Sequence, residues 1–400
     1  MADFRTIDDF EVAGKRVLLR ADLNVPMQAG RVSDTTRLDR LAPTIKELVG
    51  KRARVILLSH FGRPKGGPDR ANSLSQLVRP LCHTLGGIAV RFAPDCIGPQ
   101  AETVAQALGD GEVALLENLR FHAGEEANDA AFAEALAGLG ELYVNDAFSA
   151  AHRAHASIDR LARLLPAAAG RLMQAELEAL GRALEHPQRP LAAIVGGSKI
   201  STKLELLGNL VARVDLLAIG GAMANTFLAA QGVAIGRSLA ERDLAETARA
   251  IREKASARGC TLILPEDAVV ASELKPGVAA ATVPIGEVPA DKMILDIGPA
   301  SVRTLVQHLR TCRTLVWNGP VGAFETPPFD AGTTEIARAV AGLTQTAGLA
   351  SIAGGGDTVA ALVDAGVADR LSYVSTAGGA FLEWLEGKEL PGVAALKRRA

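Results

Sequence analysis

The segment Leu191-Ala192-Ala193-Ile194-Val195 runs directly into Gly196-Gly197-Ser198-Lys199. Five consecutive apolar residues predict a strand that is buried on both faces, as in a parallel sheet covered by helices. In open α/β sheets, ligands bind just beyond the carboxyl ends of the strands, which is where the glycine pair falls. The segment therefore predicts an α/β fold with a ligand site at the end of this strand.

The same arrangement recurs along both halves of the chain, where short apolar runs alternate with longer amphipathic stretches. In the first half, the predicted strands lead into polar segments, and they comprise residues 17–19, 55–58, 113–116 and 142–144. In the second half, the predicted strands lead into glycine or Asn-Gly, and they comprise residues 191–195, 216–219, 294–297, 315–317 and 350–353. We expect all of these strands to be parallel and covered by helices.

The chain length of 400 residues suggests two or three domains of roughly 150 residues each. Apolar residues at 172, 173, 177, 180 and 184 have the spacing of a helix. The prolines at 187 and 190 cannot continue that helix. We therefore predict a first domain of residues 1–170 joined by the tail 388–400, a connecting helix of residues 171–186, and a second domain of residues 187–387.

The composition narrows the class of protein. A formal net charge of −2 and an aromatic content of 4% argue against a nucleic-acid partner. The cysteines Cys82, Cys96, Cys260 and Cys312 form no C-x-x-C pair, which is typical of reduced thiols in a cytosolic chain. Because the first residues lack an apolar signal core and no run approaches the roughly 18 apolar residues of a membrane span, we expect a soluble cytoplasmic protein without a membrane partner.

The second half carries signals for nucleotide phosphates. Lys199 and Lys203 are four residues apart at the start of a predicted helix, so both ammonium groups would share one face. Gly354-Gly355-Gly356-Asp357-Thr358 would let the backbone approach a phosphate closely. Asp357 would either cap the helix predicted to begin at the next residue or hold Mg²⁺. The segment Ser375-Thr376-Ala377-Gly378-Gly379 offers a further helix start that could bind an anion.

The first half carries signals for a small polyanion. Arginines and histidines lie in or near the segments that follow its strands, namely Arg37, Arg63, Arg120, Arg153, His60, His152 and His155. The planar guanidinium group of arginine can bind a phosphate or a carboxylate group with two hydrogen bonds. The four arginines therefore predict a convergent anion pocket. Asp22 and Asn24 could bind substrate hydroxyls. His152 and His155 have a spacing that suits a metal, but no third ligand accompanies them, which favours a positive rim.

Taken in chain order, these segments resemble the phosphoglycerate kinase family over nearly the whole length. The segments that carry the resemblance are Arg20-Ala21-Asp22-Leu23-Asn24-Val25-Pro26, Ser59-His60-Phe61-Gly62-Arg63-Pro64, Leu116-Glu117-Asn118-Leu119-Arg120-Phe121, Ala151-His152-Arg153-Ala154-His155-Ala156-Ser157, Gly196-Gly197-Ser198-Lys199, Val316-Trp317-Asn318-Gly319-Pro320, Gly354-Gly355-Gly356-Asp357-Thr358 and Leu390-Pro391-Gly392-Val393. The resemblance implies two doubly wound, Rossmann-like parallel-sheet domains joined by a hinge helix, usually in a monomer. It also implies reversible phosphoryl transfer from 1,3-bisphosphoglycerate to ADP, giving 3-phosphoglycerate and ATP in glycolysis and gluconeogenesis.

The resemblance further implies a role for each matching residue. Binding of 3-phosphoglycerate in the first domain would involve Asp22, Leu23, Asn24, Arg37, His60, Phe61, Gly62, Arg63, Arg120 and Arg153. Binding of the nucleotide in the second domain would involve Lys199, Lys203, Gly220, Gly221, Asn318, Glu325, Gly354, Gly355, Gly356, Asp357 and Thr358. The transferring group would be surrounded by Arg37, Lys203, Gly356, Gly378 and Gly379. Asp357 would hold the Mg²⁺ that accompanies ADP or ATP, and Glu325 would reach the ribose hydroxyls.

Two positions depart from the family pattern. Ala377 stands where a glycine is usual, which matters only if the backbone there needs a positive φ. Phe61 stands where leucine is usual, and we expect no consequence. Rival interpretations are a kinase for another small acid and a nucleotide-binding regulator without catalysis. A nicotinamide-dependent dehydrogenase is disfavoured because the chain has no G-x-G-x-x-G, and a P-loop enzyme because it has no G-x-x-x-x-G-K-[ST].

Overall fold

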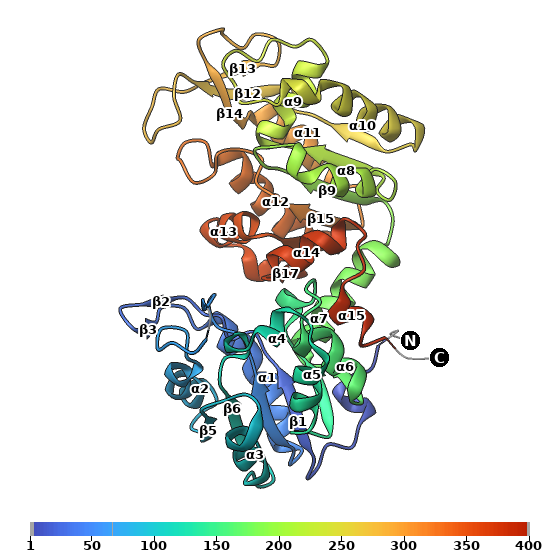
Figure 1. Cartoon of the computed structure of the whole chain (residues 1–400). Coiled ribbons are helices and arrows are strands. Elements are labelled where there is room, and N and C mark those ends of the chain that lie inside the picture. The colour runs from blue at the N-terminus through green and yellow to red at the C-terminus, as the bar shows by residue number, and fades with distance from the viewer. Residues whose placement is uncertain (1–3, 66, 398–400) are drawn as a thin grey trace. The chain divides into compact units, whose positions relative to one another are not determined.

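The structure is a computed structural model that describes residues 4–65 and 67–397 (Figure 1). The chain divides into two compact units, which we call unit 1 (Met1–Glu178 with Glu389–Ala400) and unit 2 (Ala179–Lys388). The outer ends of the predicted first domain and of its tail, residues 1–3 and 398–400, lie outside the described residues. The division falls inside the segment 171–186 for which a connecting helix is predicted.

Unit 1 contains a six-stranded sheet in which every pair of neighbours is parallel. Its order is β5-β6-β4-β1-β7-β8, with β1 (Arg16–Arg20), β4 (Arg54–Leu58), β5 (Val90–Ala93), β6 (Val113–Leu116), β7 (Leu142–Asn145) and β8 (Ala167–Ala169). The strands β6 and β7 are buried at every position, as expected for strands covered on both faces. The sequence missed β5, whose Val90-Arg91-Phe92-Ala93 is not a continuous apolar run, and β8, which consists of three alanines.

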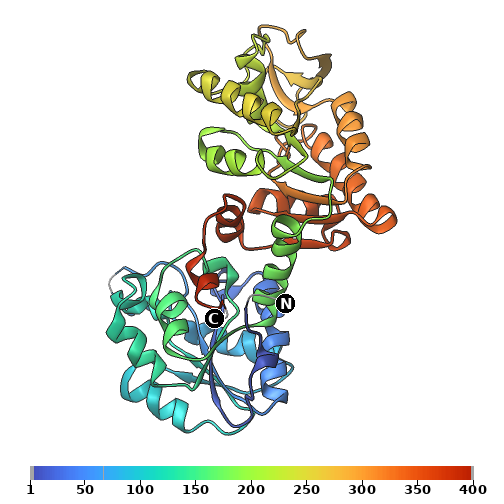
Figure 2. The same cartoon turned by 90° about the vertical axis from the view of Figure 1, so that its right-hand side faces the viewer.

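Helices cover both faces of this sheet, as Figures 1 and 2 show. The long helix α1 (Thr36–Gly50) buries Leu38, Leu41, Ile45 and Leu48, whose spacing places them on one side that packs into the core. The remaining helices of this unit are α2 (Val78–Thr84), α3 (Gly98–Gln106), α4 (Ala123–Glu126), α5 (Ala130–Ala137) and α6 (Leu161–Leu164). A short hairpin, β2 (Met27–Gln28) with β3 (Arg31–Val32), follows β1.

Unit 2 repeats the plan with a second sheet of six parallel strands. Its order is β11-β10-β9-β15-β16-β17, with β9 (Leu191–Val195), β10 (Leu216–Ile219), β11 (Thr261–Ile263), β15 (Thr314–Asn318), β16 (Ala350–Gly354) and β17 (Tyr373–Ser375). The main helices are α8 (Leu204–Leu210), α9 (Gly221–Ala230), α10 (Ala245–Ala257), α11 (Pro299–Leu309), α12 (Ala331–Ala347), α13 (Gly356–Asp364) and α14 (Gly378–Leu385). In the described part of the chain, no helix combines the length and the hydropathy needed to cross a bilayer.

One predicted strand of unit 2 lies in a different sheet. Residues 294–297 belong to β14 (Met293–Ile297), which pairs antiparallel with β12 (Asp267–Ala271) beside β13 (Ala281–Pro284). The prediction of a parallel strand was therefore wrong at this point. A short apolar run before glycine specifies a buried strand but not its direction, and here the preceding β-hairpin supplies an antiparallel partner.

The segment between the two sheets begins with helix α7 (Arg171–Leu180), which continues as one π-helical turn over Gly181–Glu185. Its first turn is fixed within unit 1. The amide of Met173 donates to Oδ1 of the fully buried Asp146 at 3.0 Å, which satisfies a free N–H of the helix start. The guanidinium of Arg171 contacts Asp8 at 2.7 Å and Glu47 at 2.6 Å.

The C-terminal segment packs within unit 1. Helix α15 (Pro391–Ala394) begins directly after Leu390, which is fully buried. The amide of Gly392 donates to the carbonyl of Ala151 at 2.9 Å, and Phe4 forms an antiparallel bridge with Lys397. The first and last described residues therefore lie side by side.

Substitution of Gly170, the residue before α7, should destabilise unit 1. A Cβ at this position would overlap the carboxylate of Asp146 and displace it from the helix start. We expect Gly170→Ala to lower the free energy of unfolding by about 2–4 kcal/mol, because overpacking and the loss of a helix cap add. Urea unfolding followed by far-UV circular dichroism measures the change.

Gly50→Ala is the matched control, because a Cβ at the last residue of α1 meets no atom within 4 Å. Its effect should stay within about 0.5 kcal/mol. Both tryptophans, Trp317 and Trp384, lie in unit 2, so their fluorescence reports on that unit separately. Equal unfolding midpoints for the two variants would contradict the role of Gly170.

Candidate functional site

In unit 1, the unusual polar residues of the sequence follow four strands that are neighbours in the sheet. The order β6-β4-β1-β7 places the carboxyl ends of these parallel strands along one edge. The segments that begin at Glu117, Ser59, Ala21 and Asp146 therefore emerge beside one another. This is the position at which open α/β sheets bind ligands.

Asp22 is the centre of the first group of contacts. Its Oδ2 accepts hydrogen bonds from the guanidinium of Arg37, on α1, and from the hydroxyl of Ser149. Its Oδ1 accepts from the amide of Asn24 at 3.0 Å. Burial opposes ionisation of Asp22, but the charge of Arg37 and these hydrogen bonds outweigh it and hold the pKa below its usual value. Asp22 is therefore a carboxylate that orients Arg37.

A second chain of contacts links three predicted residues. Oδ1 of Asn24 accepts a hydrogen bond from the amide of Gly62 at 2.9 Å. The carbonyl of Gly62 accepts in turn from the guanidinium of Arg120 at 2.8 Å. The side chain of Arg120 is 5% exposed and also pairs with Glu126 at 3.0 Å. The turn after β4 thus fixes the position of an arginine that follows β6.

His60 contacts an arginine that the residue-by-residue predictions left out. The guanidinium of Arg20, at the end of β1, lies 3.2 Å from Nδ1 of His60. Because arginine only donates, Nδ1 must accept, and the proton of the neutral ring is on Nε2. Burial first, and then the charge of Arg20, lowers the pKa of His60 well below its usual value. His60 is therefore a neutral hydrogen-bond donor at neutral pH. A buried arginine carries no distinctive sequence signal beyond its place in a strand.

Arg120 and Arg153 affect the protonation of the histidines at the same edge of the sheet. Burial, followed by the charges of Arg120 and Arg153, lowers the pKa of His155 to about 4. The same two arginines also lower the pKa of His60. Arg120 and Arg153 thus lie close enough to both histidines to perturb them electrostatically. The histidines are neutral at pH 7, so the positive charge of the pocket comes from arginine.

Three predicted residues stand apart from this group. The side chains of Leu23 and Phe61 belong to the hydrophobic core of unit 1, so only their backbone could face a ligand. The amide of Leu23 is already bonded to Ser59 at 3.0 Å and that of Phe61 to Asn118 at 3.2 Å. The side chain of Arg63 is exposed.

In unit 2, Lys203 lies at the junction of three strand-end segments. Its ammonium group donates to the carbonyl of Gly196 at 2.7 Å and to Oδ1 of Asn318 at 2.6 Å. The side-chain Nδ2 of Asn318 donates to the carbonyl of Gly354 at 2.9 Å. Burial lowers the pKa of Lys203 to about 8, although the charge of Asp357 opposes the shift. Residues at the carboxyl ends of β9, β15 and β16 are thus linked around one partly buried ammonium group.

The expected helical pair of Lys199 and Lys203 is wrong. The residues after Gly197 form an irregular segment, and the first helical turn is the 3₁₀ turn Ser201–Lys203. Lys199 precedes this turn and is exposed, whereas Lys203 ends it and is half-buried. The irregular segment after the glycine pair delays the helix by several residues, which residue spacing alone does not reveal.

The glycine run 354–356 forms the start of α13. The helix begins at Gly356, two residues earlier than a cap at Asp357 would require, and it has no side-chain cap. The cap is Gly355, whose φ of 100° is a conformation that other residues rarely adopt. Asp357 is exposed in the first turn, while the buried Thr358 hydroxyl accepts from the amide of Gly319 at 2.7 Å. Of these two, Asp357 is the residue whose side chain faces outward.

Ala377 fits its position without strain. It precedes α14 with a φ of −98°, which any residue adopts, so the missing glycine needs no change of backbone. Its amide donates to Oγ of Ser375 at 3.2 Å. Gly378 and Gly379 begin the helix, and their amides are among the free N–H groups of its first turn.

A cavity of about 400 Å³ lies next to this group in unit 2. Predicted residues on its wall are Gly197, Gly221, Glu325 and Asp357. Much of the wall is apolar, with Leu228, Leu239, Leu274, Met293 and Phe324 among its side chains. An apolar cleft with a few polar groups at one end suits a flat organic ring attached to a charged group. The sequence missed this wall, because isolated apolar residues from α9, β14 and several loops carry no motif.

Gly220 and Gly221 have a packing role beside that cavity. Gly221 begins α9 and lies so close to Gly197 that a Cβ would stand 2.6 Å from the carbonyl oxygen of Gly197. Gly220 is buried against Val321, and a Cβ there would stand 2.6 Å from its Cγ1. The predicted glycines therefore bring the segments after β9 and β10 into close contact.

Comparisons with known proteins agree on one family. A family model described as phosphoglycerate kinase matches residues 7–388. The chain is 63% identical over 393 residues to a phosphoglycerate kinase of Rhodospirillum centenum, covering 98% of this chain and 99% of that protein. It is 61% identical over 398 residues to one of Methylorubrum extorquens strain PA1, covering 99% of both.

Solved structures give the same answer. The structure of phosphoglycerate kinase from Coxiella burnetii matches with a TM-score of 0.91 and 43% identity over 98% of both chains. That of the Pyrococcus horikoshii enzyme matches with a TM-score of 0.80 and 30% identity, again over 98% of both chains. The predicted α/β fold with two parallel sheets is confirmed. This chain belongs to the phosphoglycerate kinase family.

Proposed function

We propose that this protein catalyses the reversible transfer of a phosphoryl group from 1,3-bisphosphoglycerate to ADP, giving 3-phosphoglycerate and ATP. The observation that carries the proposal is the separation of two sites with different chemistry. One sheet edge presents arginines and neutral histidine donors, and the other presents a lysine, glycine-rich backbone and an apolar cavity. The first suits a small polyanion and the second suits a nucleotide.

The glycerate ligand binds in unit 1. Arg120 and Arg153 supply charge for its phosphate and carboxylate, because guanidinium groups pair with both anions. Nε2–H of the neutral His60 donates to an anionic oxygen without adding charge. Asp22 and Asn24 bind the hydroxyl group. Arg63 and Gly62 complete the set, and Leu23 and Phe61 contribute by fixing the turns beside it. Arg37 is held by Asp22, and we assign it to the group that is transferred.

The nucleotide binds in unit 2. The apolar wall of the 400 Å³ cavity receives the base, and Glu325 binds the ribose hydroxyls. The phosphates of the nucleotide contact Lys199, Lys203 and Asn318. They also contact backbone amides of Gly354–Thr358 and of Gly378–Gly379. Gly220 and Gly221 keep the backbone close enough for this approach.

Asp357 holds Mg²⁺ together with the nucleotide phosphates. The residue fits this role because its carboxylate is exposed at the helix start and is not used as a helix cap. One carboxylate suffices, since Mg²⁺ in nucleotide sites takes most of its ligands from phosphate and water. When bound, the ion neutralises charge on the phosphate oxygens.

The reaction needs positioning and charge more than proton transfer. In the direction that consumes ATP, the acceptor is a carboxylate, which is ionised at pH 7 because its ordinary pKa is about 4. No general base is therefore required. Lys203 and Arg37 stabilise the charge that spreads over the transferring group, and the amides of Gly356, Gly378 and Gly379 assist.

The two ligands must come within about 3–3.5 Å for reaction. We therefore propose that the units close on binding and that the segment 171–186 absorbs the movement. The protein works as a monomer in the cytoplasm, where soluble glycolytic substrates are available.

A coupled assay tests the function. With Mg²⁺, ATP and 3-phosphoglycerate, the protein should form an acyl phosphate that a reductive coupling enzyme removes. Lys203→Ala should lower kcat on the order of 10²–10³-fold while changing ADP affinity less than about tenfold, because its partner charge grows in the transition state. Lys254→Ala, an exposed lysine of α10, is the control and should keep full activity. Weaker ADP binding with normal turnover would refute the role of Lys203.

The activity should decline at alkaline pH. The pKa of Lys203 is lowered to about 8, so the residue is charged below this value and loses its charge as the pH rises through it. We expect kcat/KM for ADP to fall about tenfold per pH unit above that point, since it reports the free enzyme. A profile that stays flat well above pH 8, measured with stable enzyme, would contradict a catalytic ammonium group.

Solution scattering tests closure and the monomer. The radius of gyration should fall when 3-phosphoglycerate and a nonhydrolysable ATP analogue are added together, and neither ligand alone should give the full change. The forward scattering should correspond to one chain of 41.6 kDa. An unchanged radius with both sites occupied would rule out closure, and twice the mass would rule out the monomer.

A further inference from the structure

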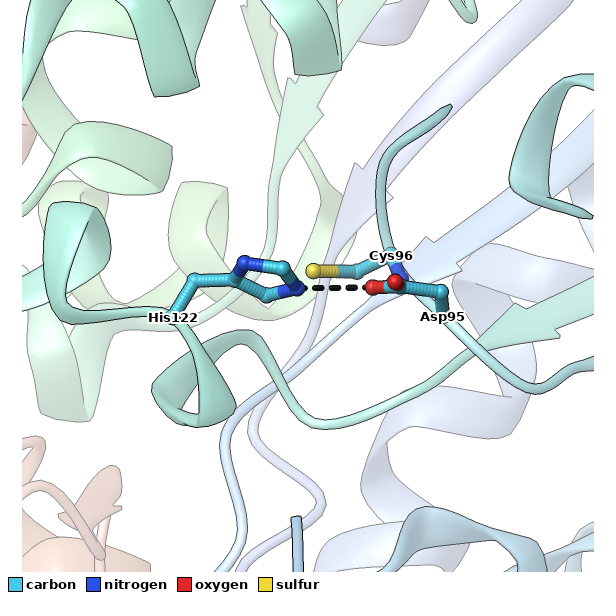
Figure 3. A group of neighbouring side chains, drawn as sticks. All are labelled: Asp95, Cys96 and His122. Atoms are coloured by element: carbon cyan, nitrogen blue, oxygen red, sulfur yellow. Dashed lines mark hydrogen bonds and ion pairs between the residues drawn. The ribbon is translucent and has the colours of Figure 1, made fainter. Parts of the chain in front are cut away.

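A cluster of metal-ligating side chains lies outside both sites described above. It consists of Asp95 and Cys96, which follow β5, and His122, which follows the 3₁₀ turn Leu119–Phe121 after β6. The strands β5 and β6 are parallel neighbours, so their carboxyl ends deliver the three residues to one place. Figure 3 shows the carboxylate, the thiol and the imidazole pointing toward one another.

The geometry is compact. Nε2 of His122 lies 2.7 Å from Oδ1 of Asp95, and one ligand atom from each of the three residues lies within 4.8 Å of the others. Two ligands of a tetrahedral zinc ion, with bonds of about 2.0–2.3 Å, stand roughly 3–4 Å apart. A metal could therefore be inserted with small side-chain movements. Within the described residues this is the one group of three such side chains.

The environment restricts how the cluster can act. Cys96 is fully buried, whereas the side chains of Asp95 and His122 are 40% and 33% exposed. The cluster is thus closed behind the sulfur and open to solvent in front of the other two ligands. Phe132 packs against the ring of His122, with centroids 5.4 Å apart, and limits its rotation.

A reactive thiol is a poorer explanation of the same residues. Burial, with the charges of Asp95 and Glu125, raises the pKa of Cys96 well above its usual value, so the thiol is protonated at neutral pH. Nucleophilic cysteines have the opposite shift. His122 also directs Nε2 at Asp95, which leaves no base in the orientation of a catalytic pair.

We propose that Asp95, Cys96 and His122 bind one thiophilic divalent cation, of which Zn²⁺ is the prime example, with water as the fourth ligand. Thiolate and imidazole favour zinc and cobalt over magnesium, which prefers oxygen ligands. On binding, the Sγ–H bond breaks, the sulfur bonds to the metal, and the proton leaves to solvent. The ion crosslinks the loop after β5 to the segment that carries Arg120, two residues before His122.

Cobalt is the probe, because a thiolate bound to Co²⁺ gives a charge-transfer absorption that oxygen ligands do not. The full-length protein, treated with a chelator and free of nucleotide, is titrated with Co²⁺. We expect a near-ultraviolet thiolate band that saturates at one equivalent, disappears when Zn²⁺ is added, and survives a large excess of Mg²⁺. Absence of the band in the wild-type protein would overturn the proposal.

Substitutions show which residues give rise to the Co²⁺ absorption band. Cys96→Ser should abolish it, and His122→Asn should weaken Co²⁺ binding at least about tenfold, because losing a ligand should cost no less than losing a group that only orients one. The double variant Cys82→Ser with His83→Asn removes the same residue types elsewhere in unit 1 and should bind as the wild type does. Persistence of the band in Cys96→Ser would refute the site. If Cys96→Ser misfolds by circular dichroism, the half-exposed His122→Asn decides, and unchanged Co²⁺ affinity there would equally refute it.

Discussion

Both sheets are built from parallel strands whose side chains are mostly buried on the two faces, and this constraint determines where chemistry can occur. Polar groups within such strands would be buried without water, so they collect where the strands end. In unit 1 the strand ends supply Asp22, His60 and Arg120, and in unit 2 they supply Gly196, Asn318 and Gly354. The same architecture thus places two groups of polar residues with different chemistry at strand ends, and we propose that each group binds one ligand.

The desolvation of a buried charge is compensated differently in the two groups of residues. Asp22 stays ionised because Arg37 and two hydroxyl or amide donors surround it, and it holds the guanidinium in place. Lys203 has carbonyl and amide oxygens as hydrogen-bond partners, and the charge of Asp357 offsets burial only in part, so the pKa of Lys203 is lowered. A weakly compensated ammonium group gains most when a phosphate arrives, which is the property a phosphoryl-transfer site needs.

Much of this arrangement could be predicted from the sequence. Continuous apolar runs located nine strands, because burial on both faces leaves a distinct pattern, but the pattern carried no direction and misplaced β14. The glycine and arginine motifs pointed to several residues that the structure brings together, such as Asn24, Gly62 and Arg120, whereas Arg63 stands apart. Features that depend on three-dimensional packing were not predictable: the contact of Arg20 with His60, the delayed helix at Lys203, the apolar wall of the cavity, and the approach of His122 to Asp95 and Cys96.

The proposed function assigns the glycerate ligand to unit 1 and the nucleotide to unit 2. Titration calorimetry of Arg37→Ala with 3-phosphoglycerate and, separately, with ADP tests this assignment. Affinity for 3-phosphoglycerate should fall at least about tenfold, because a charge-assisted contact is lost, while ADP affinity should be unchanged. A loss of ADP affinity with normal 3-phosphoglycerate binding would contradict the assignment of the two sites.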